Sequence, residues 1–331
     1  MAYLSAFLAA IVTVGAVPIS MWIANRFAVL DAPDARKVHR SPTPRIGGIG
    51  IFLGVIFAVV VTLFVRQLVG DPIPRATLRR LLAIGGAGGF IFLVGLVDDI
   101  RSVSSRFKLV ALIGAAVTVC GSGVVLSGFV VGGAPSLEFE WFGWLITAIW
   151  IIGVTVAISF IDGLDGLAGG ITLLSATVLS CLALNSDATN VAILPLALAG
   201  ALAGFLIYNW HPAKTFMGDC GSMTIGFMLA CARVLANSEV GTMEGVVVPA
   251  LAISIALLEA ALTVFRRRYL QRRSMFSAER GHIHHRLLDR GFSHRAAVVT
   301  LLGVSAIAVG IGILALSFSG WGTLAGLALL V

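Results

Sequence analysis

Long stretches without charge constrain this chain more than any other feature of its sequence. Residues 109–137 contain no charged side chain, and residues 188–213 contain none apart from His211. A helix needs about 20 apolar residues to cross the hydrocarbon core of a bilayer, and both stretches exceed that length. Charged residues make up 12% of the chain, whereas a soluble domain carries about 25%. The sequence therefore predicts an all-α, polytopic integral membrane helix bundle that forms a single domain over residues 1–331.

Hydropathy divides the chain into ten predicted membrane spans. The first span has no preceding Lys or Arg and no following cleavage site, so we interpret it as a retained helix. The apolar tail at residues 320–331 is shorter than a full span, so we expect 10 to 11 transmembrane helices. The predicted spans are residues 4–25, 46–65, 80–97, 108–129, 142–160, 167–185, 189–208, 221–236, 246–265 and 297–317.

The basic residues orient the predicted bundle. Loops that follow odd-numbered spans hold 17 of the 23 Lys and Arg residues, whereas the other loops hold only Arg66, Arg75 and Arg79. The positive-inside rule makes the first set of loops cytoplasmic and places the N-terminus outside. The net charge of +7 is then explained by topology and by anionic lipid headgroups. We therefore expect the membrane, and no nucleic acid, as a partner.

Carboxylates gather in the same set of loops. Asp98 and Asp99 end the third span, Asp162 and Asp165 lie three residues apart after the fifth, and Asp219 precedes the eighth. Two adjacent carboxylates raise each other's proton affinity unless a cation intervenes. Helix capping explains a single Asp, but not repeated pairs in a chain with so few charges. The pattern predicts one active site at the cytoplasmic face, with a hard divalent cation at Asp219 and a phosphorylated substrate.

A histidine cluster lies in the largest loop of this set. His282, His284 and His285 are followed by Arg286. The spacing His-x-His-His is not a zinc spacing, and the four cysteines form no CxxC pair, so we favour phosphate contact over zinc. Acid–base chemistry by these histidines is the alternative.

Other polar residues complete the candidate site. Lys37 and His39 lie in the first cytoplasmic loop, where a purely topological role is an equal alternative. Lys108 follows the Asp98-Asp99 pair, and Asn209 lies ten residues before Asp219. Glu259 lies in the ninth span, and an ionisable group inside a span is a functional candidate by default. The equal alternative is that its side chain reaches toward the basic run that begins at Arg266.

As an ordered set, these motifs resemble the polyprenyl-phosphate N-acetylhexosamine-1-phosphate transferase family. The similarity runs from Asp31 to about Val298 and includes Ile-Asp-Gly-Leu-Asp-Gly-Leu at 161–167, Phe-Met-Gly-Asp-Cys-Gly-Ser at 216–222 and Gly-His-Ile-His-His-Arg-Leu-Leu at 281–288. The last stretch is similar to the bacterial branch that starts teichoic acid, arabinogalactan, O-antigen or enterobacterial common antigen synthesis.

The resemblance implies an activity. Members of this family transfer an N-acetylhexosamine 1-phosphate, commonly GlcNAc 1-phosphate, from a UDP-sugar to undecaprenyl phosphate or another polyprenyl phosphate. UMP is released, and the product is the first membrane intermediate of a cell-envelope glycan. The resemblance also implies Mg²⁺ or Mn²⁺ as cofactor, the inner (plasma) membrane as location and a homodimer as a common assembly. Phosphoryl transfer is either direct or passes through a covalently modified Asp.

The resemblance also implies roles for matched residues. Asp219 matches the metal-binding Asp of the family, Asp98 and Asp99 its catalytic pair, and Asp162 and Asp165 its nucleotide-side carboxylates. The expected catalytic residues are Asp98, Asp99, His282, His284 and His285. The expected substrate-binding residues are Lys37, His39, Lys108, Asp162, Asp165, Asn209 and Arg286.

Two positions depart from the family pattern, and two other functions stay open. Val156 and Ser159 stand where the family usually has Asn. An inactive scaffold of a glycan assembly complex is therefore one alternative. A cation-coupled transporter is the other, but it predicts broken helices and acidic groups near the bilayer midplane. Here the carboxylates cluster at one water boundary.

Overall fold

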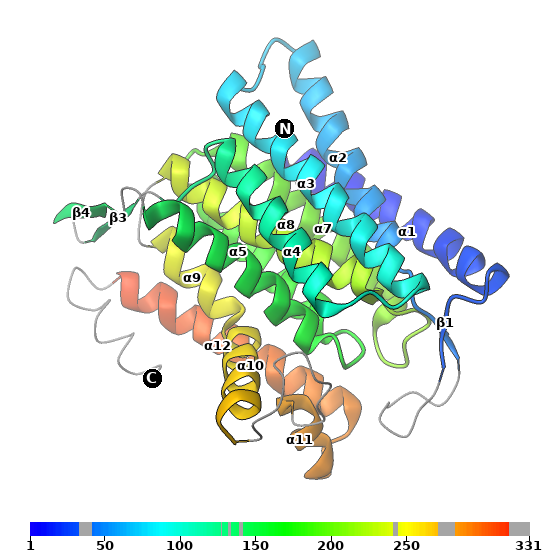
Figure 1. Ribbon diagram of the computed structural model, residues 1–331. Helices are drawn as coiled ribbons and strands as arrows, with labels where there is room; N and C mark the ends of the chain where they lie inside the picture. Colours follow the sequence, from blue (N-terminus) through cyan, green and yellow to red (C-terminus); the bar gives the residue numbers. More distant parts are fainter. Residues whose placement is uncertain are drawn as a thin grey trace.

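The computed structural model describes residues 1–32, 42–126, 128–131, 134–138, 142–240, 244–270 and 282–317. Most of these residues are helical, so the all-α prediction is confirmed (Figure 1). The long helices are α1 (Ala2–Arg26), α2 (Gly48–Leu68), α3 (Arg75–Ile100), α4 (Ser105–Gly121), α5 (Phe142–Ile161), α6 (Leu167–Asn185), α7 (Thr189–Asn209), α8 (Gly218–Val240) and α12 (His294–Ser317). The shorter elements are α9 (Glu244–Ala252), α10 (Ser254–Phe265), the π-helical turn η1 (Arg266–Leu270) and α11 (Ile283–Asp289).

Each of the ten predicted spans corresponds to helix, although two differ from expectation. Within the described residues, eight helices are long and apolar enough to cross a membrane. The fourth predicted span ends at Gly121 rather than at residue 129, because Gly123 adopts a φ of +90° that a continuing helix does not allow. The ninth is divided into α9 and α10 at Ile253. The tail at 320–331 lies outside the described residues.

Two short antiparallel hairpins were not predicted. Strand β1 (Leu30–Asp31) pairs with β2 (Thr43–Pro44), and β3 (Gly128–Val131) pairs with β4 (Ala134–Glu138). The strands β1 and β3–β4 lie at opposite ends of the bundle (Figure 1). The end of β2 and the residues after it bond the chain before α8, from Phe216 N–H to Pro44 O (2.8 Å) and from Gly47 N–H to Phe216 O (2.9 Å). The first loop is thereby attached to the start of α8.

Helix α8 is the centre of the bundle. It packs against α2, α3, α5, α6 and α7, and 94% of its span is buried by protein. In α1 only 22% of the span is buried, as expected for a helix that faces lipid. Burial by protein explains how α8 carries Ser, Thr and Asn side chains within a membrane span. At the start of α8, Cys220 is buried, whereas Gly218 and Asp219 stay partly exposed.

The predicted alternation of loops is confirmed by contacts between them. At the end of the bundle where α3, α5 and α7 finish and α8 begins, Asp99 of α3 bonds Asp219 N–H (3.0 Å). At the opposite end, Arg66 of α2 bonds Asn190 of α7 (2.7 Å). We refer to the end where α3, α5 and α7 finish and α8 begins as the acidic end of the bundle.

Candidate active site

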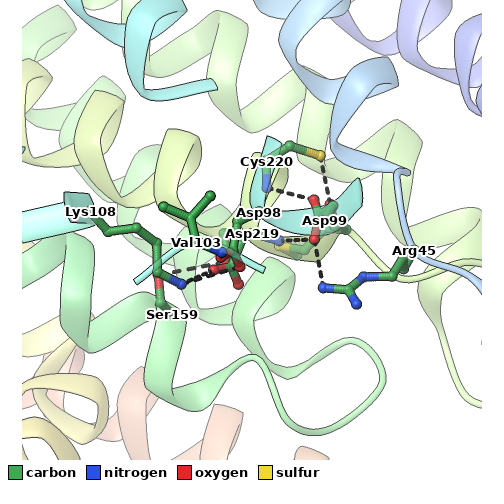
Figure 2. A network of polar contacts seen from close by, with 10 residues as sticks. Arg45, Asp98, Asp99, Val103, Lys108, Ser159, Asp219 and Cys220 are labelled. Atoms are coloured by element: carbon green, nitrogen blue, oxygen red, sulfur yellow. Dashed lines mark hydrogen bonds and ion pairs between the residues drawn. The ribbon is translucent and has the colours of Figure 1, made fainter. Parts of the chain in front are cut away.

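Helices α3 and α8 approach closely at the acidic end. A Cβ atom on Gly95 would lie 2.6 Å from the carbonyl oxygen of Asp219, so glycine is required for this approach. Asp98 and Asp99 follow Gly95 by about one helical turn and therefore lie beside the start of α8 (Figure 2). The structure thus brings residues 98, 99 and 219 together, and their roles in a reaction stay predictions.

Asp99 binds the start of α8. Its buried carboxylate accepts hydrogen bonds from Asp219 N–H (3.0 Å), Cys220 N–H (2.9 Å) and the Arg45 guanidinium (3.0 Å), as Figure 2 shows. A negative charge at a helix N-terminus is favourable because unpaired N–H groups point at it. Gly218 has a φ of +67°, and a Cβ there would lie 2.5 Å from Asp99 Oδ2. Burial opposes the charge on Arg45, but the carboxylate of Asp99 raises the pKa of Arg45 overall.

Asp98 faces a different set of partners. It accepts hydrogen bonds from Val103 N–H (2.7 Å) and from Lys108 Nζ (3.2 Å). The same ammonium lies 2.6 Å from Asp219 Oδ2, so Lys108 joins two carboxylates (Figure 2). Two carboxylates that converge on one cationic group offer the hard oxygen ligands that Mg²⁺ and Mn²⁺ prefer. The residues present therefore fit the metal that the sequence predicts.

Asp162 lies in the turn between α5 and α6, close to the carboxylates of Asp219, Asp99 and Asp165. Its burial, together with the charges of Asp219, Asp99 and Asp165, raises the pKa of Asp162 to about 8. Without a further cation, this carboxyl is largely protonated at neutral pH. Binding of a divalent cation nearby would favour the ionised form, which again fits a metal at this place.

Asp165 is engaged differently from Asp162. Its Oδ2 lies 2.7 Å from His211 Nδ1 and accepts a hydrogen bond from Ala213 N–H (3.1 Å), while its own N–H donates to His294 Nε2 (2.9 Å). By distance alone, Asp165, His211 and His294 could hold a metal ion. However, the two imidazole rings are stacked at 4.1 Å with an angle of 18°, so their in-plane lone pairs cannot both point at one ion. We interpret this cluster as a hydrogen-bonded link between three segments.

Asn209 belongs to the same link. Its Oδ1 accepts a hydrogen bond from Gly166 N–H (2.9 Å), and its Nδ2 donates to Thr215 O (2.9 Å). The side chain is buried, and both of its polar atoms bond backbone. The expected substrate contacts of Asn209 and Asp165 stay predictions, whereas their contribution to holding the two loops together is part of the structure.

The histidine segment packs against the turn after α5. A Cβ on Gly163 would lie 2.5 Å from His284 Nε2, so that ring lies directly on the turn. His284 is 2% exposed, and among the described residues its Nε2 has no hydrogen-bond partner. Burial and the neighbouring rings of His285 and His282 lower the pKa of His284 to about 3, so it is neutral at physiological pH. Arg286, two residues further along α11, is exposed.

Two residues at the acidic end were missed or only partly understood from the sequence. Arg45 was not singled out, although a basic residue between Pro44 and Gly47 in a charge-poor chain was a signal. Glu259 was a candidate, but its contact with His282 Nδ1 (2.8 Å) was not predicted. The pairing toward the basic run is confirmed, because Arg266 lies 3.0 Å from the Glu259 carboxylate. Lys37 and His39 lie outside the described residues.

The two departures from the family pattern lie on α5. Ser159 accepts a hydrogen bond from Ser222 at 3.5 Å and donates to Thr155 O (3.0 Å). Val156 packs against the apolar core. A small hydroxyl thus borders the carboxylate cluster, and the apolar side chain one turn earlier is used for packing.

Known proteins are similar to this chain over most of its length. Residues 81–237 match the model of glycosyl transferase family 4. The chain is 32% identical over 301 residues to a probable undecaprenyl-phosphate N-acetylglucosaminyl 1-phosphate transferase of Bacillus subtilis, with 89% of this chain and 80% of that protein covered. It is 35% identical over 329 residues to a decaprenyl-phosphate N-acetylglucosaminephosphotransferase of Mycolicibacterium smegmatis, with 91% and 79% covered.

A third relative is more distant. The undecaprenyl-phosphate alpha-N-acetylglucosaminyl 1-phosphate transferase of Escherichia coli K12 is 28% identical over 301 residues, with 88% of this chain and 78% of that protein covered. The matches therefore include the segments that build the acidic end. The chain belongs to the polyprenyl-phosphate N-acetylhexosamine-1-phosphate transferase family, as its motifs predict.

Proposed function

We propose that this chain transfers N-acetylglucosamine 1-phosphate from UDP-N-acetylglucosamine to a polyprenyl phosphate and releases UMP. The names of its relatives support the transferred group and the lipid acceptor. The structural observation that carries the proposal is the cluster of Asp98, Lys108 and Asp219, in which one ammonium joins two carboxylates at the water boundary. Phosphoryl transfer depends mainly on positioning and on charge stabilisation, and such a cluster supplies both.

The proposed reaction is an in-line displacement at phosphorus. An oxygen of the polyprenyl phosphate attacks the β-phosphorus of the UDP-sugar, and the bond from that phosphorus to the bridging oxygen breaks. The bridging oxygen leaves with UMP. Asp98 is suited to orient the acceptor phosphate or to take its proton, because Asp99 is fully buried with both oxygens engaged. Lys108 can offer its ammonium to the phosphates.

A covalent variant of this reaction is distinguishable. In that variant Asp98 attacks the β-phosphorus first, UMP leaves, and the lipid phosphate then displaces the carboxylate. Incubation with UDP-sugar alone would then release one UMP per protein and leave the sugar phosphate on Asp98. We favour the direct reaction, in which no UMP is released until the lipid acceptor is added.

We further propose Mg²⁺, with Mn²⁺ as an alternative, as the cofactor, and Asp219 as the residue that would hold it. The support is the Asp219 carboxylate, whose Oδ2 already binds a cationic group, the Lys108 ammonium, at 2.6 Å. Carboxylate oxygens are the ligands that these hard cations prefer. When bound, such an ion supplies neutralisation of the pyrophosphate charge.

We propose that the acidic end faces the cytoplasm, in the inner (plasma) membrane. The support is the concentration of Lys and Arg in the loops at this end. The reaction then forms the first membrane intermediate of a cell-envelope glycan. A cation-coupled transporter is disfavoured, because Asp98 and Asp219 lie in the last and first turns of their helices rather than near the bilayer midplane.

The proposal is tested with purified protein in liposomes that contain undecaprenyl phosphate. UDP-GlcNAc, other UDP-N-acetylhexosamines and Mg²⁺ are supplied, and UMP and the lipid product are followed by mass spectrometry. We expect lipid-pyrophosphate-GlcNAc from the wild-type protein and none from Asp219→Ala. Asp71→Asn, which changes a carboxylate at the opposite end, is the matched control. Absence of product from every donor, with folded protein, would contradict the proposal.

A further inference from the structure

A second buried carboxylate lies near the acidic end, on a helix outside the cluster of Asp98 and Asp219. Glu259 in α10 is 1% exposed. Burial of a carboxylate is unfavourable unless hydrogen bonds and opposite charge compensate for lost hydration. Here Thr263 Oγ1 and Arg266 Nη2 each lie 3.0 Å from Oε1, so α10 and the first residue of η1 provide two of the donors.

The other two partners of Glu259 come from the histidine segment. His282 Nδ1 lies 2.8 Å from Oε1, and Ile283 N–H donates to Oε2 (2.7 Å). These bonds span 23 and 24 residues along the chain. Ile283 is the first residue of α11, so Glu259 caps the start of the helix that carries His284. One carboxylate thus determines where the histidine helix begins.

The contact also determines which ring nitrogen of His282 bears hydrogen. An ionised carboxylate only accepts hydrogen bonds, so Nδ1 of His282 must be the donor. Nε2 is then left to face other groups, as an acceptor in the neutral ring or as a second donor in the imidazolium. A carboxylate behind a histidine fixes the tautomer and the orientation of the ring in many active sites.

The ring of His282 is part of a stack of histidine rings that reaches the turn after α5, which carries Asp162. The rings of His282 and His284 are nearly parallel, with centroids 5.4 Å apart and an angle of 8°. His284 in turn lies against Gly163, next to Asp162. Movement of His282 would therefore be transmitted through the stack to the turn that carries Asp162, a predicted nucleotide-side carboxylate.

We propose that Glu259 is a positioning residue for the transfer reaction: it holds His282 in the Nδ1–H form and fixes the start of α11, so that the histidines are presented to the Asp162 turn. The kinetic consequences of this role rest on the proposed function. Glu259 itself lies one side chain away from any substrate that His282 contacts, so its effect on turnover acts through His282.

The kinetic test is a double-mutant cycle with Glu259→Gln and His282→Ala. Gln has nearly the same shape, but its amide can donate as well as accept and no longer imposes one tautomer. We expect Glu259→Gln to lower kcat about tenfold or more, with KM for UDP-GlcNAc within about twofold of wild type. In the His282→Ala background, the same change should cost less than about twofold, because residues that act as a unit are not additive. If the loss of kcat in the double variant equalled the product of the losses in the two single variants, the proposal would be overturned.

Two further measurements are independent of the double-mutant cycle, and the second needs no turnover. Thr263→Val removes another hydrogen bond to Oε1 without touching a histidine, and we expect its kcat to stay near wild type. Nitrogen NMR of protein labelled at histidine reads the tautomer without substrate. We expect an Nδ1–H signal that disappears in His282→Ala and changes in Glu259→Gln. An Nε2–H form of His282 in the wild-type protein would overturn the proposal whatever the activity.

Discussion

The two ends of the helical bundle use charged residues in opposite ways. At the acidic end, Asp98 and Asp219 converge on a single ammonium, and Asp162 faces further carboxylates. At the opposite end, Arg66 is matched by Asp71 (2.8 Å) and by the Asn190 side chain (2.7 Å). Like charges brought together without enough counter-charge are unfavourable, whereas matched pairs anchor structure. The comparison indicates that the acidic end is organised for a ligand and the opposite end for stability.

The largest effect is expected from removing one of the converging charges. Asp219→Asn should lower kcat/KM by about 10²–10³-fold, as loss of a single charge-stabilising group does in other enzymes. The fold should tolerate this change, because it relieves repulsion between carboxylates rather than breaking the packing of α8. UMP release measures the activity, and thermal unfolding in detergent measures the stability. Wild-type turnover by Asp219→Asn would place the chemistry elsewhere.

A second prediction separates the two neighbouring carboxylates on α3. Asp99→Asn places an amide where the carboxylate accepts three hydrogen bonds, so one N–H donor meets another donor. We expect a loss of about 2–3 kcal/mol in the free energy of unfolding, together with lower activity. Asp98→Asn should reduce activity strongly while stability changes by less than about 1 kcal/mol. Equal stability of the two variants would contradict the assignment of Asp99 as the structural member.

This division of labour shows which features of the site could be predicted from sequence. Hydropathy is a local property, so the positions of the spans follow from it, and alternation of spans brings residues 98, 99, 162 and 219 to one end. Which of two adjacent carboxylates bonds the α8 backbone depends on the rotation of α3 against a helix 120 residues away. Two adjacent Asp residues do not specify that rotation, although Gly95 indicates that α3 can approach another helix closely.

The same limit explains what was missed at longer range. Arg45 and Asp99 are 54 residues apart, and Glu259 and His282 are 23 apart across residues 271–281. Each pairing requires knowledge of which loops touch. Asp165 and Asn209 illustrate a related limit: their residue types predict ligand contacts, but the bonds they make to neighbouring loops could not be predicted from sequence.

A third prediction concerns pH and divalent cations. The pKa of Asp162 is about 8 while no cation compensates for its burial and for the nearby carboxylates. Below pH 8 a cation must therefore displace a proton, so Mg²⁺ binding should strengthen as pH rises, by at most about tenfold per pH unit, and level off above pH 8. The Mg²⁺ concentration for half-maximal turnover at pH 6.5, 7.5 and 8.5 measures this dependence. In Asp162→Asn the dependence should flatten, and an unchanged slope in that variant would contradict the assignment.

The smallest effects are expected at the opposite end of the bundle. Asp71 is mostly exposed, and the guanidinium of its partner Arg66 keeps a second bond to Asn190, so Asp71→Asn should cost no more than about 1 kcal/mol in stability. Turnover, measured as UMP release, should stay within about twofold of wild type, because no described contact links this pair to the acidic end. A large loss of turnover with intact stability would mean that the ends are coupled through α2 or α7. The contrast between a ligand-binding end and a structural end would then have to be abandoned, since a matched ion pair far from the carboxylate cluster would be contributing to the reaction.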